Sequence, residues 1–189
     1  ARLRDPDEGR VRINGRNARG VSLASLRRNV GFASATMPLM RGSLSMNLRY
    51  RAPNASDDEV SQVMEICNLA PVIARLPGQE AARLSEGAPE LSIGEIQRVL
   101  IARAMLGAPP ILVLDDVDTH LDPESVMRIT EAISAYPGIV LMAATKPEMR
   151  DAATCVWRVE KGLVTAEKTP RAERIQSDES AQDVEVVRP

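Results

Sequence analysis

Residues 111–114 have the sequence ILVL, a continuous apolar run that constrains the fold more than any other part of the chain. Such a run is typical of a strand buried on both faces of a parallel sheet. A helix beginning at Pro123 and a second buried strand at residues 139–143 complete one right-handed βαβ unit. Ligands of open parallel sheets bind beyond the carboxyl ends of the strands. Asp115 and Asp116 lie at that end and indicate either a divalent cation or acids that cap the next helix.

A second signal is LSIGEIQR at residues 91–98, directly before a long helix that the Gly- and Pro-rich residues 107–110 end. The N-terminus of a helix has unpaired N–H groups and a partial positive charge, so it suits a phosphate. Ser92 and Glu95 also fit the S-x-x-E capping box, which needs no ligand. Taken alone, this segment leaves phosphate binding and ordinary helix capping both open.

The N-terminal part predicts short elements. Residues 10–13 alternate as a strand does and lead into an Asn14-Gly15 turn. Ser22 is a plausible N-cap of a brief helix, and the apolar residues 30–33 predict a strand after it.

Residues 44–106 have helical periodicity, and Ser56 begins one of the expected helices. Inward-facing positions are predicted at helical spacing after Ser56 and after Pro123: Val60, Val63, Met64 and Cys67 in the first helix, and Val126, Ile129 and Ile133 in the second. A last pair of strands is expected at 155–160 and 163–166.

Composition excludes several classes of protein. The chain has 24 basic and 26 acidic residues among 189, a net charge of -2, so it has no overall positive field for nucleic acid or an anionic membrane. No apolar run approaches the ~20 residues that cross a bilayer. Cys67 and Cys155 match no metal or redox spacing, which favours a reducing compartment. Because the sequence begins at Ala1 without a signal pattern, we expect a fragment of a longer chain or a truncated gene product.

The order of the two signals resembles the ABC ATPase family. LSIGEIQR, IARAML and ILVLDDVDTHLD follow the order and spacing of the family's signature, the helix after it, the Walker B strand and the D-loop. DPDEGRVRINGRN and SLASLRRNVGF are similar to the segments after the family's phosphate-loop helix. The resemblance implies an α/β fold of the P-loop NTPase type: a mostly parallel core sheet, a small antiparallel β portion and a helical subdomain.

The same resemblance implies the domain organisation. We expect an N-terminal sheet portion at 1–43, a helical subdomain ending in the signature helix at 44–106, the Walker B, D-loop and switch region at 107–167, and a disordered tail at 168–189. Within residues 76–87, LPGQEAARLSEG is similar to the exporter pattern T-x-V-G-E-x-G, and it keeps Glu86 in place. This similarity indicates an exporter-like subtype.

The resemblance also implies roles for residues after the strands. Asp115 would be the Walker B aspartate that holds Mg²⁺ through water, and Asp116 stands at the position of the catalytic glutamate. The shorter Asp116 side chain draws its carboxylate back, and such misplacement costs on the order of 10²-fold in rate. Thr145 stands at the switch histidine and Ala35 at the Q-loop glutamine, so both positions lose the expected chemistry.

The implied signature loop contacts a nucleotide held by the opposite domain of a dimer. This role maps onto Ser92 and Gly94, whereas Ile93 replaces the first glycine and obstructs close approach of the backbone to phosphate. Glu95 in place of glutamine is a milder change. Asp122 matches the D-loop aspartate, and the only histidine of the sequence, His120, is interpreted as an exposed or interface residue.

The pattern G-x-x-x-x-G-K-[ST] is absent from the sequence, so the main phosphate anchor is expected in a parent chain, with a natural deletion as the alternative. The implied function is that of an ATP-binding domain of an exporter-like ABC transporter, with ATP and Mg²⁺ as cofactors and a degenerate, slow site. The implied partners are a second ABC ATPase domain and a transmembrane domain, which places the chain at the cytoplasmic face of a membrane. A non-catalytic interaction or regulatory domain is the alternative, and a nucleic-acid ATPase ranks last because no basic patch is interleaved with aromatic residues.

Overall fold

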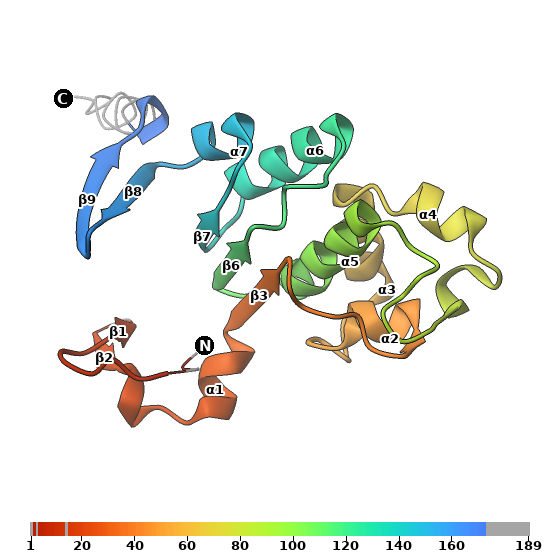
Figure 1. Cartoon of the computed structure of the whole chain (residues 1–189). Coiled ribbons are helices and arrows are strands. Elements are labelled where there is room, and N and C mark those ends of the chain that lie inside the picture. Colours follow the sequence, from red (N-terminus) through yellow and green to blue (C-terminus); the bar gives the residue numbers. More distant parts are fainter. Residues whose placement is uncertain (1, 3, 14, 173–189) are drawn as a thin grey trace, which may run out of the picture.

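A three-stranded parallel sheet forms the centre of the molecule. The computed structural model describes residues 2, 4–13 and 15–172. Strands β3 (Val30–Ser34), β6 (Ile111–Asp115) and β7 (Ile139–Ala143) lie in the order β3-β6-β7, with β6 in the middle (Figure 1). Both pairs are parallel. This sheet, with small antiparallel strand pairs and helices around it, confirms the predicted α/β fold with a mostly parallel core sheet.

One face of this sheet is covered by the described residues, whereas the other face is covered only toward β3, where Val30 and Ser34 are buried. Leu112 and Leu114 of β6 are buried in the core, and α5 packs against both β3 and β6. On the other face Val113 is half-buried, while Ile139 and Leu141 of β7 are 59% and 40% exposed. Burial on both faces, predicted for β6, is therefore incomplete, and the predicted burial of β7 is wrong for Ile139 and Leu141, because the described residues leave this part of the second face exposed.

The helical region follows β3 and contains most of the core. Its helices are α2 (Leu44–Arg49), α3 (Asp57–Ile66), α4 (Ala70–Arg75) and α5 (Ile93–Met105), and its other elements are η2 (Gln79–Ala81) and the antiparallel strands β4 (Gly42–Ser43) and β5 (Arg83–Leu84). Local sequence fixes the helix ends, since Ser56 and Ser92 each form a complete capping box with the glutamate three residues later. Val60, Val63 and Cys67 are buried and Met64 is partly buried, which confirms the predicted inward face.

The N-terminal part consists of a short hairpin and one helix. Strands β1 (Arg12–Ile13) and β2 (Arg16–Asn17) pair antiparallel, and the predicted turn between them includes Asn14, which lies outside the described residues. η1 (Ala18–Gly20) and α1 (Leu23–Arg28) follow. The Ser22 hydroxyl accepts a hydrogen bond from the Ser25 N–H at 3.3 Å, so the predicted N-cap is confirmed.

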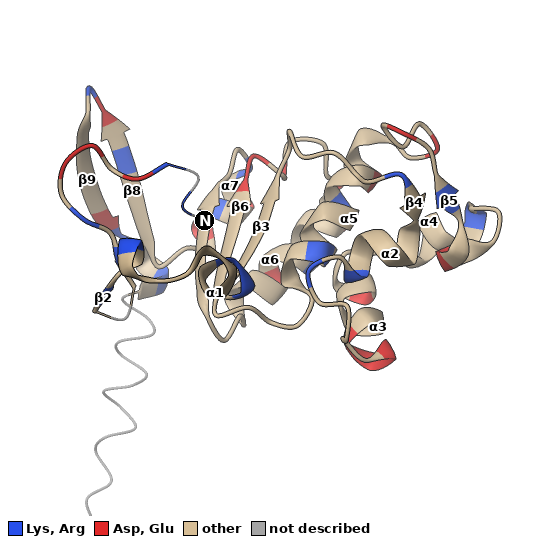
Figure 2. Cartoon of the chain, turned by 90° about the horizontal axis from the view of Figure 1, so that it is seen from below, with Lys and Arg blue, Asp and Glu red and all other residues tan. Residues whose placement is uncertain are grey.

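The C-terminal part adds α6 (Pro123–Ser134), α7 (Pro147–Asp151) and a hairpin of β8 (Cys155–Glu160) with β9 (Leu163–Lys168). Val126, Ile129 and Ile133 are buried on α6, as their spacing predicts. The hairpin lies at the end of the molecule opposite the helical region, and charges of both signs are spread along the chain (Figures 1 and 2).

The start of the expected tail is ordered. Strand β9 continues to Lys168, and the Arg171 guanidinium donates to the Ser134 backbone oxygen at 2.8 Å and to the Ser134 hydroxyl at 3.0 Å. The sequence pattern missed this anchor because the two residues are 37 positions apart. The rest of the expected tail, residues 173–189, lies outside the described residues.

Candidate functional site

The carboxyl ends of the three parallel strands bring the predicted strand-end residues together. The Ala35 N–H donates to the Asp115 backbone oxygen at 3.0 Å, and the Asp116 N–H donates to the Ala143 oxygen at 3.1 Å. Parallel strands present their carboxyl ends at the same edge, so residues about 80 positions apart in sequence meet there. Ala35, Asp115 and Asp116 therefore share one edge of the sheet.

Asp115 presents its carboxylate to solvent at this edge. Its Oδ2 atom accepts a hydrogen bond from the Ser34 hydroxyl at 3.1 Å. The two side chains offer the oxygen ligands that Mg²⁺ prefers, and Mg²⁺ is commonly held by one or two carboxylates together with water and phosphates. Within the described chain, no three His, Cys, Asp or Glu side chains gather into a metal site. The arrangement fits Mg²⁺ bound with a nucleotide and does not form an all-protein cage.

Asp116 begins the loop that leaves the sheet. Its φ of 53° lies in the left-handed region, which aspartate tolerates better than most residues. Its side chain is exposed, and its backbone oxygen accepts a hydrogen bond from the Thr119 hydroxyl at 3.4 Å. The carboxylate of Asp116 is therefore available to a bound ligand.

The signature residues occupy the N-terminus of α5. The Ser92 hydroxyl accepts from the Glu95 N–H at 3.3 Å, and Glu95 Oε2 accepts from the Ser92 N–H at 2.7 Å. Arg75 of α4 donates to the same Glu95 oxygen. Burial opposes ionisation of Glu95, but the hydrogen bonds from Arg75 and Ser92 outweigh it, and the net effect lowers the pKa of Glu95. Glu95 is thus the capping acid that the S-x-x-E pattern predicts. Its ion pair with Arg75 was not indicated by any sequence pattern.

The signature helix contacts the loop after β6 through a glycine and a buried glutamine. The His120 N–H donates to Gln97 Oε1 at 3.0 Å, and Gln97 is only 2% exposed. A Cβ atom on Gly94 would lie 2.4 Å from the His120 backbone oxygen, so this close approach requires glycine. Ile93, the neighbouring residue, is 60% exposed. No local pattern indicated the role of Gln97, because its partner lies 23 residues away.

Thr145 and Asp122 have structural partners of their own. The Thr145 N–H donates to Asp118 Oδ2 at 2.7 Å. Asp122 caps α6 and accepts from the Ser125 N–H at 2.9 Å and from the Ser125 hydroxyl at 2.7 Å. Burial opposes ionisation of Asp122, and the bonds from Ser125 outweigh it, so the pKa of Asp122 is lowered. Sequence reasoning missed Asp118, whose partners lie 27 and 28 residues further along the chain.

The structure therefore places the predicted site residues in two separate groups. One is the sheet edge with Ala35, Asp115, Asp116 and Thr145, and the other is the N-terminus of α5 with the signature loop 92–95. In the part of the chain that the structure describes, no hydrogen bond or ion pair joins the two groups. Together with the parallel sheet and the helical region, they define an α/β nucleotide-binding domain of the ABC ATPase type.

Comparisons with known proteins agree with this class. The family described as ABC transporter matches residues 1–119. The chain belongs to this family. It is 39% identical over 129 residues to the beta-(1-->2)glucan export ATP-binding/permease protein NdvA of Bradyrhizobium diazoefficiens, and 40% identical over 121 residues to the mitochondrial iron-sulfur clusters transporter ABCB7 of Oryzias latipes. These matches cover 68% and 64% of this chain.

A solved structure, that of a bacterial Atm1-family ABC exporter with ATP bound, matches 97% of this chain with a TM-score of 0.78 and 26% identity. The comparisons confirm the exporter-like ATP-binding domain that the sequence predicted. The chain spans only 21% of NdvA, 16% of the ABCB7 protein and 33% of the exporter structure. None of the described helices is both long and apolar enough to cross a bilayer.

Proposed function

We propose that this chain couples ATP binding and hydrolysis to substrate translocation as part of an exporter-like ABC transporter, with a low-activity site. The observation that carries the proposal is the sheet edge, where Asp115 ends the central strand of a parallel sheet, Asp116 follows it and Ala35 is hydrogen-bonded beside them. The signature helix supports it, since its N-terminus is capped at Ser92 and contacts the loop after β6.

Three departures support low activity. Asp116 has a short side chain where the family uses glutamate, so it positions an attacking water poorly. Thr145 has no positive charge for the γ-phosphate, and its backbone N–H is engaged by Asp118. The Ile93 side chain is 60% exposed at the N-terminus of α5 and obstructs a phosphate there. ATP bound with Mg²⁺ would contact these residues, and Asp115 would hold the metal through water.

The phosphate anchor would come from a parent chain. The exposed part of the second face of the sheet carries Ile139 and Leu141, with Val113 half-buried beside them, and an apolar surface of this kind usually has a packing partner. Strand β7 pairs only with β6 among the described strands, so its second edge is open to another strand. A strand and a helix around a phosphate loop would complete the sheet at this edge and cover this face.

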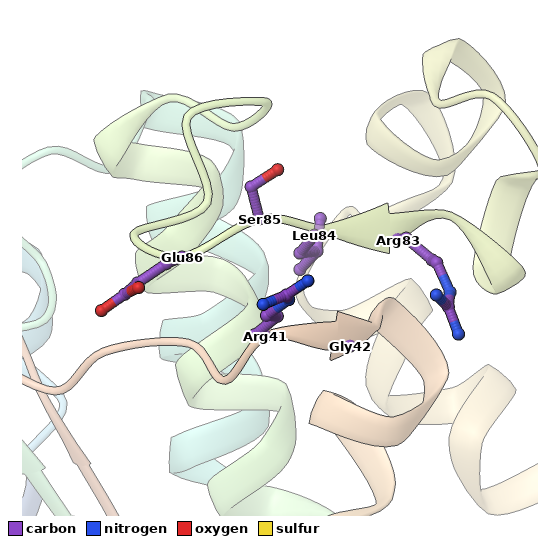
Figure 3. A pocket seen from close by; sticks show the side chains of 6 residues that line it. All are labelled: Arg41, Gly42, Arg83, Leu84, Ser85 and Glu86. Carbon is purple, nitrogen blue, oxygen red and sulfur yellow. The ribbon is translucent and has the colours of Figure 1, made fainter.

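The partners would be a second ABC ATPase domain and a transmembrane domain, the latter in the same parent chain or in a separate one. A hollow of about 460 Å³ lies between the start of β4 and β5, lined by Arg41, Gly42, Arg83, Leu84, Ser85 and Glu86. Figure 3 shows Glu86 and Arg83 pointing to opposite ends of this strand pair. One wall of the hollow is formed by residues of the exporter-like stretch 76–87. We therefore propose this hollow as the surface on which the transmembrane domain docks. This docking would hold the chain at the cytoplasmic face of the membrane.

Nucleotide binding by the chain is the first test. Titration of the purified chain with a fluorescent ATP analogue in the presence of Mg²⁺ is expected to give weak binding, because the phosphate-loop lysine and its backbone N–H groups are absent from the sequence. Asp115→Asn should weaken it further, whereas Asp151→Asn, which removes another exposed acid on α7, should leave it unchanged. A low-micromolar dissociation constant would contradict the expected weak binding and the assignment of the phosphate anchor to a parent chain.

Catalysis in the full assembly is the second test. Two composite sites would each combine the strand-end residues of one domain with the signature loop of the other, and they would be unequal. Ile93→Gly should raise ATPase turnover, and Asp116→Ala should change it little, with Asp151→Ala as the matched control. Loss of ATPase activity in Asp116→Ala would establish Asp116 as a working catalytic carboxylate and refute the low-activity site.

A non-catalytic interaction domain is the second candidate. The observation that favours it is that polar groups at both places already have hydrogen-bond partners within the chain. The Ser92 hydroxyl accepts from the Glu95 N–H, and the Thr145 N–H donates to Asp118. If both Ile93→Gly and Asp116→Ala leave transport and ATPase activity of the assembly unchanged, this second function replaces the first.

A further inference from the structure

Asp118 is a buried acid in the loop after β6. It is 1% exposed and is the one carboxylate among the buried polar residues of the described chain. A charged group in such a place is costly unless hydrogen bonds compensate for the lost water. No ion pair involving Asp118 occurs among the described residues. Its stabilisation therefore comes from hydrogen-bond donors.

Those donors all belong to the segment after β7. Asp118 Oδ2 accepts from the Thr145 N–H and the Lys146 N–H, each at 2.7 Å, and from the Thr145 hydroxyl at 3.2 Å. Two consecutive backbone N–H groups and a hydroxyl thus converge on one carboxylate oxygen. The other oxygen, Oδ1, is buried without a hydrogen-bond partner. Asp118 consequently ties the loop after β6 to the segment after β7.

The donor set that holds Asp118 is also suited to a phosphate oxygen. Successive backbone N–H groups with a neighbouring hydroxyl form an anion-binding concavity. Here the anion is a side chain of the same chain. Because the Thr145 hydroxyl donates its single proton to Asp118, that hydroxyl cannot donate to a second anion at the same time. A phosphate at these donors would also be repelled by the Asp118 carboxylate.

We propose that Asp118 is an internal anion that holds Thr145 and Lys146 away from nucleotide, so that these donors reach a phosphate only after the contact with Asp118 breaks. The proposal rests on the function proposed above, in which Thr145 faces the γ-phosphate. The contact between Asp118 and the segment after β7 is then autoinhibitory, and it breaks when nucleotide binds.

The test uses the full chain with tripolyphosphate as the probe and follows the backbone amides of Thr145 and Lys146 by NMR. In the wild-type chain both amides should be protected from hydrogen exchange and should respond little to tripolyphosphate. Asp118→Ala should remove the protection and strengthen the saturable response of both amides by at least about tenfold, since charge-assisted bonds to the competing anion are lost. Asp151→Asn, which neutralises an exposed acid on α7, should behave as the wild type.

Asp118→Asn keeps the shape of the side chain, so it decides the matter if the alanine variant does not fold. A neutral amide oxygen binds the donors about half as strongly as a carboxylate, so this variant should also bind tripolyphosphate more tightly at Thr145 and Lys146. Equal responses in the wild type and in both variants would overturn the proposal, as would unprotected amides in the wild type. A response gained on mutation, with neither ATP binding nor ATPase activity in the full assembly, would instead refute the proposed function and leave the Asp118 contact established.

Discussion

Replacing Gly94 with alanine should destabilise the chain, although a glycine-to-alanine change within a helix usually has the opposite effect. Gly94 is the second residue of α5, and removing glycine from such a position normally stabilises by about 0.4–1 kcal/mol. Here a Cβ atom would lie 2.4 Å from the His120 backbone oxygen, whereas ordinary contacts begin at 3.4 Å. The shortfall is about 1.0 Å, the difference between these two distances.

The backbone at residue 94 and at His120 would have to move apart by this distance. The His120 N–H is itself bonded to the buried Gln97, so the loop cannot retreat without straining that 3.0 Å hydrogen bond. Overpacking of this kind costs about 1–3 kcal/mol, which exceeds the helix-propensity gain. We therefore expect Gly94→Ala to lower the free energy of unfolding by about 1–2 kcal/mol.

Urea unfolding followed by circular dichroism measures this free energy. Gly20→Ala is the matched control, since a Cβ atom there meets nothing within 4 Å, and it should leave stability unchanged or slightly raised. If Gly94→Ala is as stable as the wild type, the close packing of the signature helix on the loop after β6 is wrong.

Two further predictions concern titrating groups. Burial raises the pKa of the Cys67 thiol to about 12, so a thiol reagent at pH 8 should label only the exposed Cys155 in the native chain and both cysteines after unfolding. Two labels on the native chain would contradict this. Glu95→Gln removes the ion pair with Arg75 and should cost about 0.5 kcal/mol at pH 7. Because the folded pKa of Glu95 is lowered, this stabilisation is complete above the unfolded value of about 4.3 and is lost as pH falls through the folded pKa. Unfolding curves at pH 7 and at pH 3 test it, and a difference that persists undiminished at low pH would refute it.

Local sequence determined the helix starts and the nature of the central strand. Ser22, Ser56 and Ser92 cap their helices because a hydroxyl bonds an N–H three residues later, an interaction contained within one turn. The apolar run at 111–114 forms the central parallel strand for a similarly local reason, since consecutive apolar residues avoid solvent best inside a sheet. The order of the motifs then identified the family, which the comparisons confirmed.

Only the tertiary structure decided which surfaces are covered and which polar groups meet. Ile139 and Leu141 have the composition of a buried strand but remain exposed, because burial depends on a packing partner that this stretch of sequence does not encode. Asp118 looks like an ordinary loop acid, and its partners at Thr145 and Lys146 are brought to it by the parallel pairing of β6 with β7. Gly94 and Gln97 contact His120 because α5 packs against the loop after β6. Contacts of this kind between distant residues follow from how the strands and helices pack.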